Sequence, residues 1–427
     1  MSGEFDVCVG VSRRAVNEAL ASLHRSLGPE AFTETLESDD GKLSYRLCEA
    51  PELDFEPVAD EGGVLGALGG EESTVCVALR LSQVSLDVET DVYSKTVRIA
   101  ASARCEISVD EEGTLSFEPS QVSLAWEDRP SILDRVVNSL LLPALLEVVR
   151  ELVVGVRLPP VRFAGLALGS FVLAVAGDHV LVAANLEEKG RPRLPANMAI
   201  PPLGFFLLLS DRFRLVAARA LVEGRCKTLE REGRLGLPFT RLRWAAEVCI
   251  SDVEVSLAGR DSFRVTGLVV GRIELAVRQL FEIGASFNLY PEPQPHARIR
   301  LFVEEEAVKV AVHDLDSFRF RVSPTGDFFQ RMTAGALKPA ANAISRYLTP
   351  LLVGYLGELV LPVWEIEDIP IEEREANLVI SPRNVRLEPF DDKLCVGAAL
   401  GVRGEARPMT SQHEASEDRA GAEARNA

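Results

Sequence analysis

The chain has 427 residues, of which 47% are hydrophobic, and its formal net charge at pH 7 is −18. This length is comfortable for two domains with separate cores, and the apolar fraction excludes an intrinsically disordered chain. The negative charge argues against a nucleic-acid binder, because phosphate contacts need clustered Lys and Arg.

The seven cysteines are scattered and include no C-x-x-C pair, which favours neither a zinc site nor a disulfide framework. Acidic residues near the amino terminus stand where a secretory leader would be basic. The longest uncharged stretch, residues 194–210, contains three prolines and is short for a transmembrane span. We therefore expect a cytoplasmic protein with no signal peptide and no transmembrane segment.

A strand followed by a capped helix opens the chain. Residues 7–11 alternate like a strand, Ser12 is a good helix N-cap, and apolar residues then recur at helical spacing up to a Gly-Pro step. The same order returns in residues 205–224, with Ser210 as the cap and Gly224 as the expected stop. The sequence therefore predicts two copies of one strand-to-helix unit.

Long β-strands follow the opening helix in each half. In residues 97–109 apolar and polar side chains alternate, which is typical of a half-buried antiparallel strand. Residues 75–88 alternate as well, but the apolar parity changes between Leu81 and Val84, which predicts a β-bulge or a sharp bend. Residues 281–322 show the same alternation of apolar and polar side chains, so we expect strongly curved sheets in both halves.

A long amphipathic helix is predicted in each half, after the strands. Apolar residues recur at helical spacing in residues 133–152 and again in residues 337–359. Each segment contains a proline, Pro143 or Pro350, which should kink the helix, and each leads into a Leu-Pro step.

The two halves also end alike. DHVLVAANL begins at Asp178 and DKLCVGAAL begins at Asp392, 214 positions later, and the two share Asp, Val, Ala and Leu at the same places. Because the order and type of the predicted elements repeat, together with the prolines and glycines that end them, we interpret the chain as an internal duplication of about two hundred residues. The expected division is an N-terminal unit over residues 1–187, a proline-rich linker over 188–202, a C-terminal unit over 203–402 and a disordered tail over 403–427.

On these features the chain resembles the tubular lipid-binding (TULIP) superfamily, in the two-domain branch that contains bactericidal/permeability-increasing protein. The resemblance is carried by the opening VGVSRRAVNEALASL, the segment NSLLLPALLEVVRELVVGVRLP with its Leu-Pro exit, and the two endings. It covers residues 5–400 and includes no catalytic signature. It implies an α+β fold of two tandem elongated barrels, each a strongly bent antiparallel sheet wrapped around a long helix.

The resemblance further implies an apolar groove between each long helix and its sheet, able to hold lipid acyl chains. The basic tip and the disulfide of that branch have no evident counterpart here, so endotoxin binding is not expected. For each groove candidate, packing as ordinary core is an equal alternative. The candidates are Val16, Leu20, Leu23, Leu141, Leu145, Val149, Leu152, Leu221, Ile344, Leu348, Leu352 and Leu356.

No catalytic motif accompanies the five histidines, since the GxSxG, HExxH, P-loop and GxGxxG patterns are all missing. His313, Asp314 and Asp316 could be offered to a metal, but a solvated strand face is the stronger interpretation. The glycine-rich residues 62–72 are interpreted as a loop rather than a phosphate cradle. We therefore expect no enzyme activity, no cofactor and no bound metal.

The expected function is that of a lipid carrier or lipid-transfer protein, which binds phospholipid or fatty-acid chains and contacts membranes transiently. Two acyl chains carry about thirty methylenes, worth about 25 kcal/mol of transfer out of water, so only a continuous apolar slot could accept them. The alternative is a non-enzymatic interaction scaffold with filled grooves, as in tubular lipid-binding relatives from clostridial neurotoxin gene clusters. The sequence identifies neither the lipid nor a protein partner.

Overall fold

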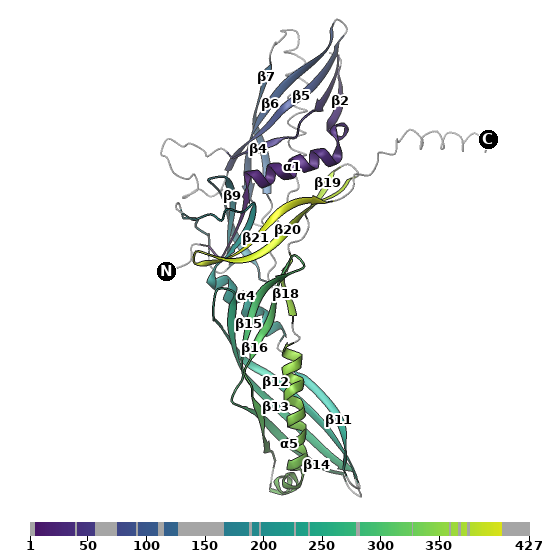
Figure 1. Ribbon diagram of the computed structural model, residues 1–427, viewed down its shortest axis with the longest axis vertical. Coiled ribbons are helices and arrows are strands. Elements are labelled where there is room, and N and C mark those ends of the chain that lie inside the picture. Colours follow the sequence, from purple (N-terminus) through teal and green to yellow (C-terminus); the bar gives the residue numbers. More distant parts are fainter. Residues whose placement is uncertain are drawn as a thin grey trace, which may run out of the picture.

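The computed structural model describes residues 5–38, 41–55, 75–90, 93–109, 115–126, 166–187, 190–195, 198–225, 228–237, 240–278, 282–326, 328–357, 360–365, 369–373 and 376–403. Antiparallel sheets dominate this part of the chain, and the helices lie against them. Figure 1 shows an elongated molecule, with one sheet towards each end and a third sheet at the waist.

The N-terminal end of the molecule is a sheet with the strand order β2-β3-β5-β6-β7, in which β4 also pairs with β5. Its strands are β2 (Thr33–Ser38), β3 (Gly41–Leu47), β4 (Glu52–Asp54), β5 (Val75–Thr90), β6 (Tyr93–Val109) and β7 (Leu115–Trp126). Helix α1 (Arg13–Leu27) and the short 3-10 helix η1 (Pro29–Phe32) precede these strands in the chain.

The waist is a seven-stranded sheet with the order β19-β20-β21-β10-β1-β9-β8. Its strands are β1 (Val7–Ser12), β8 (Leu168–Ala176), β9 (His179–Leu186), β10 (Phe205–Leu209), β19 (Ile369–Glu373), β20 (Ala376–Phe390) and β21 (Lys393–Arg403). The two ends of the described part of the chain therefore lie in one sheet, because β1 and β21 both pair with β10.

The C-terminal end of the molecule is an eight-stranded sheet with the order β11-β12-β13-β15-β16-β18, to which β14 and β17 are attached through β13. Its strands are β11 (Leu229–Leu237), β12 (Thr240–Leu257), β13 (Ser262–Arg278), β14 (Glu282–Glu292), β15 (His296–Glu304), β16 (Ala307–Leu315), β17 (Arg319–Pro324) and β18 (Val360–Glu365). Helix α4 (Asp211–Arg225) lies near the waist, and helix α5 (Phe328–Gly357) lies along the far end.

The alternation expected for the long strands is confirmed in β5 and β6. On one face of β6, Ile99, Ala101, Ala103, Cys105 and Ile107 are buried, while the intervening residues are half-buried or exposed. The parity change predicted in β5 is also confirmed, because the pairing of β5 with β6 shifts register between Leu81 and Val84. A bulge there lets one long strand bend while it keeps its apolar side chains inside.

At the centre of the waist, β1 and β10 run antiparallel, and Val9 pairs with Leu207. These two residues are 198 positions apart, the same separation as the helix-capping serines Ser12 and Ser210. Each serine accepts a hydrogen bond at 3.1 Å from a backbone N–H of the first helical turn, Ala15 in α1 or Phe213 in α4. Both helices are 15 residues long. The geometry around β1 and β10 is therefore related by an approximate twofold axis.

The closing hairpins repeat with the sequence separation of 214. Ser170 in β8 and Asn384 in β20 both have positive φ, at 43° and 55°, and each sits where the hairpin pairing shifts register. Likewise Gly177 and Asp391 open the two hairpin turns with φ of 57° and 53°. Sequence-distant segments thus share the same backbone irregularities.

Three sequence expectations differ from the structure. The described strands form open sheets, with β11 and β18 ending the path at the C-terminal end, so the expected closed barrels are not seen there. Gly224 does not stop α4, which continues to Arg225, because one glycine near a helix end is tolerated and helix ends fray by one or two residues. Helix α5 begins at Phe328, well before the expected Leu337.

The predicted helix over residues 133–152 lies outside the described residues, as do residues 404–427. The division into residues 1–187, 188–202, 203–402 and 403–427 therefore stays a prediction. Within the linker, Leu194, Met198 and Ile200 pack against a cluster on one face of the waist sheet that includes Cys8, Phe206 and Cys395.

Candidate functional site

The seam between α5 and the C-terminal sheet is filled by its own side chains. Ile344, Leu348 and Leu352 are 2%, 1% and 2% exposed, and they belong to one core cluster with Phe287 and Leu289 of β14. The side chain of Leu356 lies outside the described residues. The structure therefore brings three of the four α5 candidates together, as packed core.

The seam at α1 is only partly described. Leu23 is buried, Leu20 is half-buried, and Val16 packs against the core of the N-terminal sheet. The candidates Leu141, Leu145, Val149 and Leu152 lie outside the described residues. Whether these residues line a groove stays a prediction.

The seam at α4 contains an apolar cavity, and the candidate Leu221 lines it. The cavity volume is about 20 Å³, enough for about one water molecule, whereas drug-sized ligands occupy pockets of about 300 to 1,000 Å³. The walls come from α4, from the C-terminal sheet and from the waist sheet. They consist of Leu209, Phe213, Arg214, Ala217, Ala218, Leu221, Phe263, Ile299, Leu301, Val308, Val310, Leu387 and Leu394.

Arg214 is the one charged side chain in this lining. Its side chain is 3% exposed, and its guanidinium donates to the backbone carbonyl of Arg260 through Nη1 and to the Asp211 carboxylate through Nη2. The third nitrogen, Nε, is buried and has no hydrogen-bond partner among the described residues. A cation therefore lies at an otherwise apolar cavity, and its Nε–H donor is unused.

Arg214 is not among the residues predicted from the sequence, although the spacing along α4 holds a signal for it. Arg214, Ala217, Ala218 and Leu221 are spaced i, i+3, i+4 and i+7, so they share one face of the helix. A prediction that takes only apolar residues as the inner face of a helix omits an arginine in that stripe.

Acidic groups and a second arginine surround this end of α4. The Asp211 side chain is 57% exposed, and the Arg260 residue is exposed. Asp392 accepts a hydrogen bond from the Lys393 ammonium at 2.5 Å, which lowers the pKa of that carboxyl, and Arg260 adds a smaller lowering. Charges of both signs therefore lie near the polar end of the seam.

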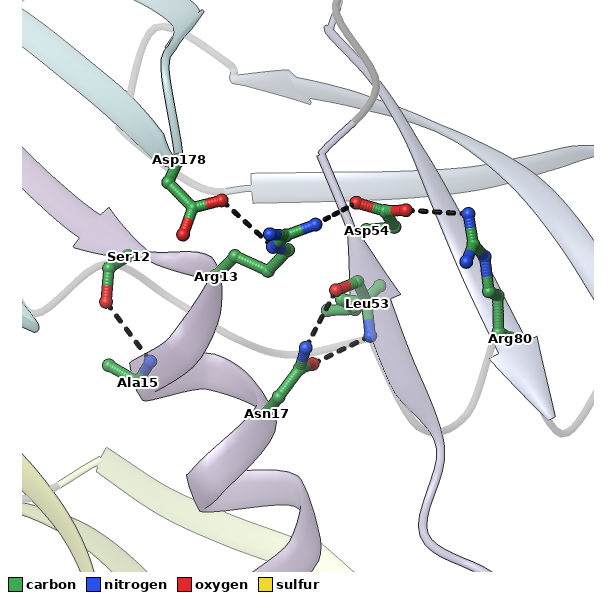
Figure 2. A network of polar contacts seen from close by, with 8 residues as sticks. All are labelled: Ser12, Arg13, Ala15, Asn17, Leu53, Asp54, Arg80 and Asp178. Atoms are coloured by element: carbon green, nitrogen blue, oxygen red, sulfur yellow. Dashed lines mark hydrogen bonds and ion pairs between the residues drawn. The ribbon is translucent and has the colours of Figure 1, made fainter. Parts of the chain in front are cut away.

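Helix α1 begins in a different polar setting, shown in Figure 2. Arg13 contacts Asp54 of β4 at 2.6 Å and Asp178 of the β8–β9 turn at 2.9 Å, and Arg80 of β5 contacts the other oxygen of Asp54 at 2.7 Å. Asn17 exchanges two hydrogen bonds with the backbone of Leu53. These contacts attach the first turns of α1 to β4 and to the β8–β9 turn, and Arg80 links Asp54 in turn to β5.

A larger hollow, of about 790 Å³, lies on β11 to β14 and is mainly polar. Its charged lining residues are Glu232, Arg243, Arg272 and Glu274, of which Arg272 and Glu274 pair at 3.0 Å. Its size is that of a ligand pocket, but an open hollow of balanced charge offers an acyl chain no continuous apolar wall. We therefore place the candidate site at α4.

The described residues contain no group of three His, Cys, Asp or Glu side chains placed to hold a metal ion. His313, Asp314 and Asp316 are all exposed in the structure. The glycine-rich residues 62–72 lie outside the described residues. No described helix combines the length and the apolar character needed to cross a membrane.

Comparison with known proteins gives structural likenesses but no sequence family. No family model matches the chain, and no curated protein matches it. Among solved structures, P47 of Clostridium botulinum E1 aligns with 10% identity over 95% of this chain and 100% of that chain, with a TM-score of 0.38. P47 from Clostridium botulinum A2 aligns with 8% identity over 92% and 97%, with a TM-score of 0.34.

A lipopolysaccharide binding protein aligns with 11% identity over 93% of this chain and 99% of that chain, with a TM-score of 0.27. All three scores are below 0.5, so the likenesses carry no argument about the activity of this chain.

Proposed function

We propose that this protein binds the acyl chain of a lipid in the α4 seam and acts as a non-enzymatic lipid carrier. The observation that supports the proposal is the composition of the cavity, whose lining is apolar except for one buried arginine. An amphiphile has the matching chemistry, because its tail is aliphatic and its head is polar.

The energetics of transfer favour such a seam. A sixteen-carbon chain gains about 12 kcal/mol on leaving water, at about 0.8 kcal/mol for each methylene, provided that every part of it meets apolar atoms. The cavity of about 20 Å³ is too small for that chain, so binding requires α4 to move away from the sheet. Ala217 and Ala218 face the cavity from α4 and have little side chain to displace.

A second candidate function is that of an interaction scaffold whose grooves are filled. The burial of Ile344, Leu348 and Leu352, each at 2% exposure or less, favours it for the α5 seam. A helix packed in this way leaves an acyl chain no room without a rearrangement of the core. The two candidate functions therefore differ in what the α4 seam does.

Native mass spectrometry after gentle purification, with extraction and identification of any bound lipid, tests the proposal. We expect stoichiometric lipid on the parent protein. Leu221→Trp should reduce that lipid, because the indole is larger than the cavity of about 20 Å³ and blocks the seam. Its stability cost should be smaller than that of the same change at a fully buried position, because Leu221 is only half-buried.

Leu348→Trp is the matched control on α5. Its side chain replaces a leucine in a close-packed core, so it should cost about 1 to 3 kcal/mol of stability and leave the lipid content of the folded fraction unchanged. A parent protein that carries no lipid, and takes none from vesicles, would favour the scaffold.

A further inference from the structure

Arg214 is placed as a lipid-contacting residue would be, within the stripe of α4 that faces the cavity. Phe213, Ala217 and Ala218 beside it are 0%, 5% and 4% exposed. A helix face buried to this degree normally holds only apolar side chains, since burial of an unpaired charge is strongly unfavourable. The arginine therefore needs a reason beyond the packing of α4.

The contacts of Arg214 leave its charge incompletely paired. The Asp211 carboxylate is more than half exposed, so water screens its interaction with the guanidinium. The Arg260 carbonyl satisfies one further N–H but brings no charge. A buried N–H without an acceptor costs about 1 to 3 kcal/mol, and native structures rarely keep one without a role.

We infer that Arg214 anchors the head of the ligand, and that the α4 seam takes a single-chain amphiphile with an anionic carboxylate or phosphate head in preference to a neutral lipid. This inference rests on the proposed function and adds the class of ligand to it. Arginine suits such a head because Nε and Nη2 form one edge of the guanidinium, which binds two oxygens of a carboxylate or phosphate together.

Asp211 has a defined part in this arrangement. It accepts from Nη2, which belongs to the same guanidinium edge as the unused Nε. An incoming anionic head must therefore share or displace the Asp211 carboxylate. Because Asp211 is exposed, it can turn towards water when the ligand head arrives.

The experiment measures binding of three probes to the full-length protein by partition from cyclodextrin: hexadecanoate, hexadecyl phosphate and methyl hexadecanoate. We expect the anions to bind about tenfold more tightly than the neutral ester, as for a charge-assisted hydrogen bond in a buried site. The stronger of the two anions identifies the head as carboxylate or phosphate. Arg214→Met should remove the preference and keep ester binding, whereas the exposed Arg212→Met should keep both.

Asp211→Asn provides a second variant that leaves the arginine in place. It should tighten both anions about threefold or more, because the competing carboxylate is gone, without changing the affinity for the ester. Equal binding of all three probes to the parent, or an anion preference that survives in Arg214→Met, overturns the head-group inference but leaves acyl-chain binding standing. Binding of none of the probes overturns both.

Discussion

Single residues at the first turn give the matched helices α1 and α4 different polar contacts. Arg13 opens α1 and is drawn outward to Asp54 and Asp178, whereas the position 198 residues later is Asp211, which pairs with Arg214 of its own helix. The residue that matches Asp178 in the second hairpin is Asp392, so an ion pair of the α1 kind would bring two carboxylates together at α4. Among the described residues α4 therefore has no counterpart of the Arg13 ion pairs, and its Arg214 instead donates to the backbone carbonyl of Arg260.

Cysteine burial gives a prediction about pH. Burial raises the pKa of Cys8 to about 12, that of Cys395 to about 12 and that of Cys105 to about 11, from an ordinary value of 9.0. An unfolded thiol loses its proton at lower pH than these, so the native state binds more protons between pH 9 and 12. The stability from the buried thiols is fully present below about pH 9 and is lost as the pH rises towards 12.

The measurement is the free energy of unfolding in denaturant between pH 8 and 11.5. We expect the decline above pH 9 to be shallower in Cys8→Ala and in Cys395→Ala than in the parent. Cys48→Ala, at an exposed cysteine, should follow the parent slope. Equal slopes in all four proteins would show that the buried thiols do not contribute.

At the scale of elements, much of the β-structure could be predicted, because in a strand with one buried face the alternation of apolar and polar residues indicates which side chains face the core. The parity change between Leu81 and Val84 has no other simple reading, and the register shift occurs there. The two serine caps are equally local, because the capping oxygen and the N–H it accepts from are three residues apart. Signals of this kind do not depend on the rest of the chain.

Whether a helix face lines a groove or packs as core could not be predicted in the same way. Ile344, Leu348 and Leu352 have the spacing of either role, since periodicity reports which face is apolar and not what covers it. The prediction of closed barrels was wrong for a related reason, because long alternating strands are found both in barrels and in open curved sheets. Arg214 was not predicted because the cavity that it lines is completed by residues distant in sequence, such as Phe263, Leu301 and Leu387.

For the whole molecule, the joint between the two ends is the pair of central strands β1 and β10. Gly10 lies opposite Phe206 in this pair, and a Cβ added at Gly10 would overlap the Phe206 ring, which is 0% exposed. The glycine therefore makes room for an aromatic side chain that lies across the joint. A change at this point acts on both ends of the molecule together.

Gly10→Ala should lower the stability by about 1 to 3 kcal/mol through overpacking at the joint. Adding Phe206→Leu should recover part of that loss, because the smaller side chain frees the space, and a double-mutant cycle on melting temperatures measures the coupling. Gly335→Ala in α5, where nothing lies within 4 Å of an added Cβ, is the control and should not destabilise the protein. If the changes in stability caused by Gly10→Ala and Phe206→Leu were additive, the two residues would not be coupled at the joint.

Photolabelling of the full-length protein with a hexadecanoate analogue that carries a diazirine near the end of its chain tests acyl-chain binding in the α4 seam. Crosslinked peptides are then identified by mass spectrometry. We expect labels in α4 (Asp211–Arg225) and in β15 and β16 (His296–Leu315), and a loss of those labels in Leu221→Trp. Labels concentrated on α5 (Phe328–Gly357), or labelling that Leu221→Trp does not change, would contradict acyl-chain binding in the α4 seam.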